Sequence, residues 1–439
     1  MDIDPIIKEV APGFTEYWDI GTLIGDVSNL KGQDTLIKKF LKYYYTLLRQ
    51  NAFDVPDDIL TYDFGNNHKQ FMRVDLEHSC VCFSQIEGEV IVIGDIHGDW
   101  ISFLKVLFDA DIINKLRKGK LGQFILLGDY IDRGECSFEV LVSVFILHAL
   151  FIDKITLLKG NHENDLKLCN EFPGCIANFL SDKQSLEKII GKIKAIINLM
   201  PYFAYVRDCK KFFVHGGVPV IPVSGFKTLL LSEMNCKSYL WSDPCASITI
   251  VTIRENNIGI PGVADSERGA GYYFSEEVMK QLQTDIIIPI KQCVRAHEAF
   301  DSFYEANVFK NRSVISLFTT GQGSAHAYSE YKNCRPYYAV YDSLESEIEL
   351  KALNRKGFMD KFAFLIALKL KSLEKGVTCF SVSYNQFFSY EIQCNGETLL
   401  DDIHLPKKIV REIFGDCDQQ DKENKTNSTP CMSFNRCHP

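Results

Sequence analysis

The feature that most constrains this chain is a set of short apolar runs that each end at a glycine-flanked polar residue. These runs occupy Glu89–Gly94, Gln123–Gly128, Lys154–Lys159 and Lys211–Val214. Short apolar runs bounded by turn-forming residues are typical of buried strands. Each is followed at once by Asp, Asn or His beside a glycine that permits a tight turn. Because ligands of α/β proteins bind beyond the carboxyl ends of strands, we expect these polar side chains to line one site.

Helical periodicity between the predicted strands indicates the α/β fold class. Apolar residues recur at helical spacing in Trp100–Asp109 and Phe138–Leu150, which lie between the first three strands, and again in Lys183–Leu199. Alternation of strand and helix favours an α/β core. Two later apolar segments, Val314–Thr319 and Tyr337–Leu353, predict β-rich closure of that core.

The two ends of the chain predict additions to this core. Thr35–Arg49 has the apolar spacing of an amphipathic helix that covers one edge of the core. Beyond the core, the pattern predicts a helix near Asp360–Leu373 and a hairpin at Val377–Ile392. We therefore divide the chain into an N-terminal extension (1–40), a catalytic domain (41–354), a C-terminal α/β appendage (355–415) and a polar, disordered tail (416–439).

Composition excludes several classes of protein. The formal net charge of −9 over 439 residues disfavours nucleic-acid binding, which relies on excess Lys and Arg, whereas basic peptides or regulatory proteins remain open as partners. The 15 scattered cysteines of a long chain indicate reduced thiols rather than a disulfide framework. The apolar run Val140–Ile152 is too short to cross a membrane, and the first residues lack a signal peptide's pattern. We expect no membrane contact and a cytoplasmic location, with the nucleus left open.

The residue types at the predicted strand ends are metal ligands. Asp, His and Asn suit borderline and hard ions such as Mn, Fe or Zn, and the absence of thiolates from the set argues against a structural zinc site. The first four strand ends supply Asp95, His97, Asp129, Asn161 and His215. Two divalent ions would leave net positive charge beside two aspartates, which suits a phosphate dianion and would acidify a bound water.

Six short strings, in order along the chain, resemble the signature of the phosphoprotein phosphatase family of serine/threonine phosphatases. They are GDIHG (94–98), GDYIDRG (128–134), GNHE (160–163), HGG (215–217), WSDP (241–244) and RAH (295–297). The resemblance covers about residues 40–354. It implies the calcineurin-like metallophosphoesterase fold, a central β-sandwich flanked by helices.

The resemblance also implies a role for each matched residue. It predicts two divalent or trivalent ions (Mn, Fe or Zn), the first bound by Asp95 and His97, with Asp129 bridging both. The second ion would be bound by Asn161, His215 and His297.

The implied reaction is hydrolysis of phosphoserine or phosphothreonine in a phosphoprotein by in-line attack of metal-bound hydroxide. His162, kept protonated by Asp132, would protonate the leaving alkoxide. The phosphate would be held by Arg133, Arg268 and Asn161, where Arg268 rests on the less regular string SERG (266–269).

The segment after Val314–Phe318 departs from the family pattern. Gly323 and Ser324 occupy the positions of a tyrosine and a cysteine in the loop that overhangs the family's active site. The aromatic residues downstream, His326, Tyr328 and Tyr331, are candidates to replace that loop. Two alternatives therefore stay open: a hydrolase of dinucleoside polyphosphates or another phosphoester, and a catalytically silent scaffold that binds partners through its extensions.

Overall fold

The computed structural model of the chain describes most residues up to 353 and short strands beyond. The described residues are 3–65, 68–166, 169, 171–246, 251–253, 258–300, 309, 311–321, 328–331, 333–353, 379–384, 390–394, 397–403 and 432–433. None of the helices in these segments is both long and apolar enough to cross a membrane.

A five-stranded sheet carries the first three predicted strands. Its order is β17-β16-β4-β5-β6. Strands β4, β5 and β6 are parallel to one another, β16 pairs antiparallel with β4, and β17 pairs antiparallel with β16. The bounds are β4 (Glu89–Ile93), β5 (Leu121–Leu126), β6 (Ile155–Leu157), β16 (Tyr337–Tyr341) and β17 (Glu349–Ala352). The predicted strands and the predicted β closure at 337–353 are thus confirmed, each within a few residues.

A seven-stranded sheet carries the fourth predicted strand. Its order is β1-β2-β3-β7-β8-β14-β15, in which β8, β14 and β15 run parallel. The bounds are β1 (Ala52–Asp54), β2 (Lys69–Arg73), β3 (Ser79–Phe83), β7 (Phe203–Val206), β8 (Lys211–Val214), β14 (Gln292–Arg295) and β15 (Val314–Ser316). The run at 211–214 therefore lies in a different sheet from the other three, which the sequence pattern could not distinguish.

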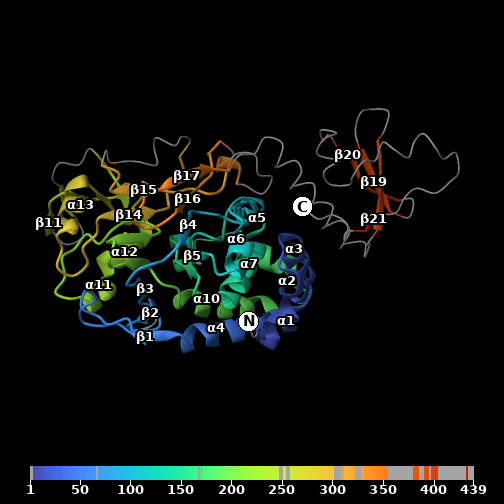
Figure 1. The fold of residues 1–439 in the computed structure, drawn as a ribbon, viewed down its shortest axis with the longest axis horizontal. Helices are drawn as coiled ribbons and strands as arrows, with labels where there is room; N and C mark the ends of the chain where they lie inside the picture. Colours follow the sequence, from blue (N-terminus) through green and yellow to red (C-terminus); the bar gives the residue numbers. More distant parts are fainter. Residues whose placement is uncertain are drawn as a thin grey trace.

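The two sheets pack face to face around one apolar layer. Val92 and Ile125 from the five-stranded sheet and Phe213 and Val294 from the seven-stranded sheet are all fully buried in that layer. Side chains of a sandwich alternate between the inner and outer faces of each sheet, so every strand also contributes to an outer layer. The predicted fold class, a β-sandwich flanked by helices, is confirmed (Figure 1).

Helices cover the outer face of the five-stranded sheet. The predicted helices appear as α5 (Trp100–Asp109), α7 (Ser137–Leu150) and α10 (Ser185–Asn198). Helix α7 has no polar face, because it is buried among α4, α5 and α9. The remaining helices on this side are α1 (Pro5–Val10), α2 (Pro12–Tyr17), α3 (Ile20–Asn29), α4 (Asp34–Gln50), α6 (Ile112–Arg117), α8 (Asn161–Asn164) and α9 (Phe172–Phe179).

A second group of elements covers the outer face of the seven-stranded sheet. Phe226, Tyr239 and Met279 from three helices pack there against Phe212 and Cys293 of the sheet. The elements of this side are α11 (Phe226–Leu231), α12 (Glu233–Trp241), α13 (Glu276–Gln283), β9 (Asp243–Pro244), β10 (Val251–Ile253), β11 (Ile258–Ile260), β12 (Val263–Asp265) and β13 (Tyr272–Phe274).

The N-terminal extension is part of the main core. Phe14 and Val27 belong to the same buried cluster as the helices α7 and α10. The expected boundary at residue 40 falls inside α4, so residues 1–40 and 41–354 do not pack as separate units. Thr35–Arg49 is confirmed as a covering helix, since α4 contacts α10 and α7.

The C-terminal region contains a four-stranded antiparallel sheet of order β20-β19-β18-β21. The predicted hairpin at 377–392 corresponds to the antiparallel pair β18 (Cys379–Tyr384) and β19 (Tyr390–Cys394), followed by β20 (Glu397–Ile403). β21 (Met432–Ser433) pairs with β18, which differs from the expectation of a wholly unstructured tail. The helix predicted near 360–373 lies outside the described residues.

A buried histidine in α7 makes the stability of this core depend on pH. His148 Nδ1 lies 2.7 Å from the Tyr44 hydroxyl, and burial, reinforced by nearby Lys69, lowers the pKa of His148 to about 3. An unfolded histidine has a pKa of about 6.5, so the unfolded chain binds an extra proton below that pH. The stability that the neutral ring contributes is therefore complete above pH 6.5 and is lost as the pH falls toward 3.

When the pH falls from 7 to 5, we expect proton binding to His148 in the unfolded chain to lower the free energy of unfolding by about 2 kcal/mol. A His148→Gln variant, which cannot titrate, should lose that part of the pH dependence in urea unfolding measured at both pH values. The exposed His68 provides the control, because His68→Gln should keep the wild-type pH dependence. Equal pH dependence in wild type and His148→Gln would contradict the assignment.

Candidate metal centre

Parallel strands of both sheets end at the same place. β4, β5 and β6 lead into Asp95 and His97, Asp129, and Asn161, whereas β8 and β14 lead into His215 and His297. A bridge between Asp95 and Phe318 joins the end of β4 to the segment after β15. The structure thus brings together the six residues expected as metal ligands: Asp95, His97, Asp129, Asn161, His215 and His297.

Asp129 lies at the middle of the group. Its Oδ2 is 3.4 Å from His97 Nε2 and 3.4 Å from His215 Nε2. Asp95 lies on the same side as His97, with 3.7 Å between Asp95 Oδ2 and His97 Nε2. A single carboxylate between two histidines from different sheets has the position that a bridging ligand requires.

The second half of the group surrounds Asn161. Asn161 Oδ1 is 2.8 Å from His215 Nε2 and 3.0 Å from His297 Nδ1, and the two rings are 3.2 Å apart at those nitrogens. The donor atoms of Asp129, His215 and His297 all lie within 4.8 Å of one another. This spacing fits ligands that share one ion.

The histidines are neutral and oriented for metal binding. His97 Nδ1 lies 3.2 Å from Ile131 O, and His215 Nδ1 lies 3.1 Å from Leu127 O. A carbonyl oxygen only accepts, so Nδ1 carries the proton in both rings and Nε2 offers its lone pair to the centre. Burial holds the pKa of both rings well below the usual value, as it does for His297.

The charges of the cluster favour bound cations. Burial raises the pKa of Asp95 to about 7 and that of Asp129 well above its ordinary range, and the Asp95 charge adds to the shift of Asp129. His297 Nε2 is buried and has no hydrogen-bond partner among the described residues. Two buried carboxylates and three neutral imidazoles, one of which has an orphaned nitrogen, fit a site for two cations of the Mn, Fe or Zn class.

The backbone at the centre is strained. His97, Asp129, Asp132, Arg133 and His297 all have positive φ, between 46° and 72°. Non-glycine residues rarely adopt this region, and such strain persists where the surrounding structure holds it for a function. Sequence reasoning identified the residue types but gave no signal for this conformation.

Glu163 holds the loop that carries Asp129. Its fully buried carboxylate accepts hydrogen bonds from the backbone N–H groups of Asp129 (2.8 Å), Tyr130 (2.9 Å) and Gly160 (3.0 Å). A Cβ on Gly160 would lie 2.1 Å from Asp129 Oδ1, so only glycine permits this approach. Glu163 thus fixes the position of the central carboxylate without belonging to the expected ligand set.

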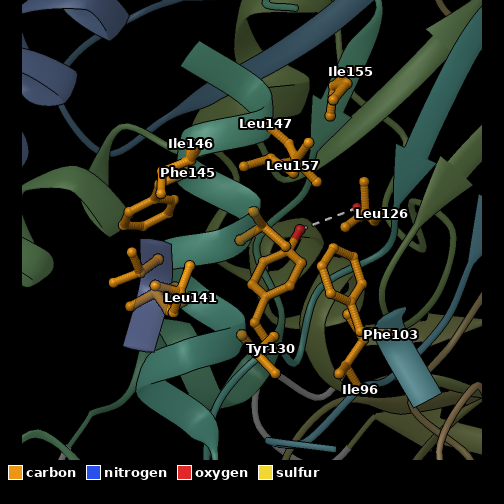
Figure 2. Close-up of a cluster of buried hydrophobic side chains, with 14 of the residues drawn as sticks. Ile96, Phe103, Leu126, Tyr130, Leu141, Phe145, Ile146, Leu147, Ile155 and Leu157 are labelled. Atoms are coloured by element: carbon orange, nitrogen blue, oxygen red, sulfur yellow. Dashed lines mark hydrogen bonds between the residues drawn. The ribbon is translucent and has the colours of Figure 1, made fainter. Parts of the chain in front are cut away.

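Tyr130 anchors the same loop in the apolar core. Figure 2 shows its ring among side chains of α7, β5 and β6, including Leu126, Leu141 and Leu157. Its hydroxyl lies 2.8 Å from Leu158 O and 3.2 Å from Leu126 O. Packing and hydrogen bonds therefore hold Tyr130 in place, which limits movement of the neighbouring Asp129 carboxylate.

His162 and Asp132, expected as the acid and its partner, are paired. His162 Nδ1 is 2.8 Å from Asp132 Oδ2, and His162 Nε2 points toward the centre, 4.0 Å from Asp129 Oδ2. The hydrogen bond from His162 lowers the pKa of Asp132 although burial opposes it. An ionised Asp132 on one side of the ring stabilises the protonated imidazole.

The two expected phosphate-binding arginines occupy different settings. The Arg133 guanidinium lies over the ring of Tyr331, with Cζ 5.4 Å from the ring centroid. Arg268 Nε is 2.9 Å from Asp243 Oδ2, and its side chain is 44% exposed. The other oxygen of Asp243 binds the buried Arg295 at 2.8 Å. Arg268 is therefore tied to the RAH segment that carries His297.

Sequence reasoning missed the part played by the segment after β15. Thr319 Oγ1 accepts from Gly94 N–H at 2.9 Å and donates to Tyr337 O, and Thr320 Oγ1 donates to Asp99 at 2.7 Å. Tyr331 stacks on His97 with ring centroids 5.5 Å apart. Of the three aromatic residues proposed to replace the missing loop tyrosine, the structure places Tyr331 at the centre, whereas Gly323, Ser324 and His326 lie outside the described residues.

Comparisons with known proteins agree with this arrangement. Residues 88–300 match the family model described as calcineurin-like phosphoesterase. Serine/threonine-protein phosphatase 5 of Arabidopsis thaliana is 28% identical over 231 residues, which is 52% of this chain and 39% of that protein. A PP2A-like serine/threonine-protein phosphatase of Candida albicans is 24% identical over 231 residues, 50% of this chain and 49% of that protein.

A solved structure of a serine/threonine phosphatase from Saccharomyces cerevisiae, with similarity to a human phosphatase, aligns with a TM-score of 0.48 at 16% identity. It covers 73% of this chain and 93% of that chain. The chain spans about half the length of the curated relatives it matches. The match to the family model covers the strand ends from β4 to the RAH segment.

The centre should bind about two Mn²⁺ ions per chain when the purified protein is reconstituted and its metal content is measured by mass spectrometry. Asp129→Asn removes the charge shared by both halves, so its content should fall below one ion per chain, and Mn²⁺ should no longer raise its melting temperature. Asp208→Asn is the control, since the side chain of this aspartate is 54% exposed and is not among the six expected ligands. Unchanged Mn²⁺ content in Asp129→Asn would contradict the central position of this carboxylate.

Proposed function

We propose that this chain hydrolyses phosphoserine and phosphothreonine esters in proteins, because residues 88–300 match the family model described as calcineurin-like phosphoesterase. The observation that carries the proposal is the His162–Asp132 pair at hydrogen-bonding distance beside the six converging ligands. The similarity to proteins named serine/threonine-protein phosphatases supports the choice of substrate. The same residue set supports two bound ions of the Mn, Fe or Zn class.

Bound ions would supply positive charge to the phosphoryl group and lower the pKa of a water molecule at the centre. The chain's own residues would do the rest of the work. Asp95, His97 and Asp129 would hold one ion, and Asp129, Asn161, His215 and His297 the other. Neutral histidines with Nδ1–H groups held by backbone carbonyls keep these ligands oriented.

His162 would act as the general acid. A serine or threonine alkoxide is a poor leaving group and must gain a proton as the ester bond breaks. His162 Nε2 faces the centre while Asp132 holds Nδ1 at 2.8 Å, so the protonated ring is stabilised and aimed. The proton on Nε2 would pass to the leaving oxygen, and solvent would restore it afterwards.

Arg133 and Arg268 would bind the phosphate oxygens, with the Asn161 amide beside them. The guanidinium groups remain charged at all relevant pH values and present several donors to a tetrahedral anion. Asp243 orients Arg268, and the face of Tyr331 supports Arg133. The phosphoprotein would be the partner of the chain, and the four N-terminal helices and the C-terminal sheet would be available to regulatory proteins.

A panel of phosphoserine and phosphothreonine peptides, compared with diadenosine tetraphosphate, tests the proposal on the Mn²⁺-loaded protein. We expect the peptides to be hydrolysed with the higher kcat/KM. Preference for the dinucleotide would overturn the substrate class while keeping the chemistry, whereas no hydrolysis of any phosphoester by the metal-loaded protein would overturn the enzyme itself.

His162→Ala should lower kcat for a phosphoserine peptide by about 10²- to 10⁴-fold, because the alkoxide loses its proton donor. An aryl phosphate has a better leaving group, so the same variant should retain much more of its activity there. Mn²⁺ content should be unchanged, because His162 is outside the predicted ligand set. His68→Ala, an exposed histidine, is the control. An equal loss on both substrates would argue against a general acid.

Tyr331→Ala should lower kcat/KM for phosphopeptides by about tenfold, mainly through KM, because Arg133 loses the ring that supports it. Tyr331→Phe keeps the ring and should keep the activity. Tyr328→Ala is the matched control, since its ring lies 5.6 Å from that of Tyr331 by centroid, in the same segment. Inhibition by inorganic phosphate, measured in all three variants, should weaken only in Tyr331→Ala. A fall in kcat alone would contradict a role in binding phosphate.

A further inference from the structure

A buried thiol lies against the His162–Asp132 pair. Cys169 is 2% exposed, and its Sγ is 3.9 Å from His162 Nδ1 and 3.2 Å from His162 O. One nitrogen of His162, one carboxylate oxygen of Asp132 and Cys169 Sγ all lie within 4.8 Å of one another. These three donors differ from the six residues of the metal centre, which include no sulfur.

Asp132 has an oxygen without a partner. Asp132 is 3% exposed, and its Oδ1 makes no hydrogen bond with the described residues, although Oδ2 is paired with His162. The carboxyl group of Glu171 interacts with Asp132, and this contact raises the pKa of Glu171. A buried carboxylate in contact with a second carboxyl group is an arrangement that a cation would stabilise.

We propose that His162, Asp132 and Cys169 form a separate zinc site that switches off the general acid. Zinc prefers four ligands in a tetrahedron and accepts imidazole nitrogen, carboxylate oxygen and thiolate sulfur together. The three side chains supply one donor of each kind, and a water molecule or the Glu171 carboxylate would complete the tetrahedron. Mn²⁺ and Mg²⁺ prefer oxygen ligands, so the thiolate selects zinc.

Zinc at this site would change the proton balance of His162. The ion would occupy Nδ1 in place of the proton held by Asp132, and that proton and the Cys169 thiol proton would leave to solvent. No electron is transferred. The metal-bound ring could lose its Nε2 proton only by becoming an imidazolate, which makes it a far weaker acid than imidazolium. The inhibition rests on the proposed function of His162, whereas zinc binding does not.

Cobalt serves as the probe of binding, because a cobalt–thiolate bond gives a charge-transfer absorption band in the near ultraviolet. Co²⁺ added to the Mn²⁺-loaded wild-type protein should produce this band, since the Mn²⁺ ligand set has no sulfur and cannot. Cys169→Ser should abolish the band and leave the Mn²⁺ content unchanged. Cys175→Ser is the matched control, a half-buried cysteine of α9 that should keep the band. Wild-type protein without the band overturns the site.

Zinc inhibition of phosphopeptide hydrolysis tests the consequence. The zinc concentration for half inhibition should rise by about tenfold or more in Cys169→Ser and remain at the wild-type value in Cys175→Ser. Equal zinc sensitivity in wild type and Cys169→Ser overturns the inhibitory role. If the cobalt–thiolate band appears but the protein has no phosphoesterase activity, the zinc site is supported and the proposed function is refuted. The two failures are therefore distinguishable. Far-ultraviolet circular dichroism of each variant checks that the fold is retained.

Discussion

Two carboxylates buried in the seam between two sheets are the constraint on which the rest of the structure depends. Asp95 and Asp129 are each 1% exposed, burial raises the pKa of both, and the Asp95 charge raises that of Asp129 further. Burial of paired negative charge is costly unless cations or hydrogen bonds offset it. The protein supplies backbone donors from the other loops, since His297 N–H bonds Asp95 at 3.0 Å and His162 N–H bonds Asp129 at 3.1 Å.

Those donors couple the ligands to one another. His297, which would bind an ion through its ring, also holds Asp95 through its backbone N–H. Displacement of the loop that carries His297 would therefore displace the loop that carries Asp95. The positive φ angles of His97, Asp129 and His297 show that the surrounding structure, not local preference, fixes these conformations. The apolar layers on both sides of the sandwich supply the rigidity, and Tyr130 connects the helical layer directly to Asp129.

The sequence predicted most of the fold and which residues would lie together at the strand ends, because both depend on local signals. Strands at 89–94 and 123–128 and the helix at 100–109 follow from apolar periodicity, and the ligand types follow their strands. Division of the strands between two sheets could not be predicted, since the run at 211–214 has the same apolar pattern as the others. The boundary expected at residue 40 lies within α4, whose amphipathic face shares one core with the helices before it, a contact that local periodicity does not reveal.

The sequence named Tyr331 as one of three candidates to replace the family's loop, but it could not choose among them. Its ring reaches His97 and Arg133 from a position more than 190 residues further along the chain, through the segment after β15 that begins with Thr319 and Thr320. No periodicity encodes such a contact. Gly323 occupies the position of the family's loop tyrosine, yet an aromatic ring eight positions later lies against Arg133, the arginine expected to bind phosphate. The face of Tyr331 can therefore support the Arg133 guanidinium, although the ring comes from a different position of the segment than the family's tyrosine.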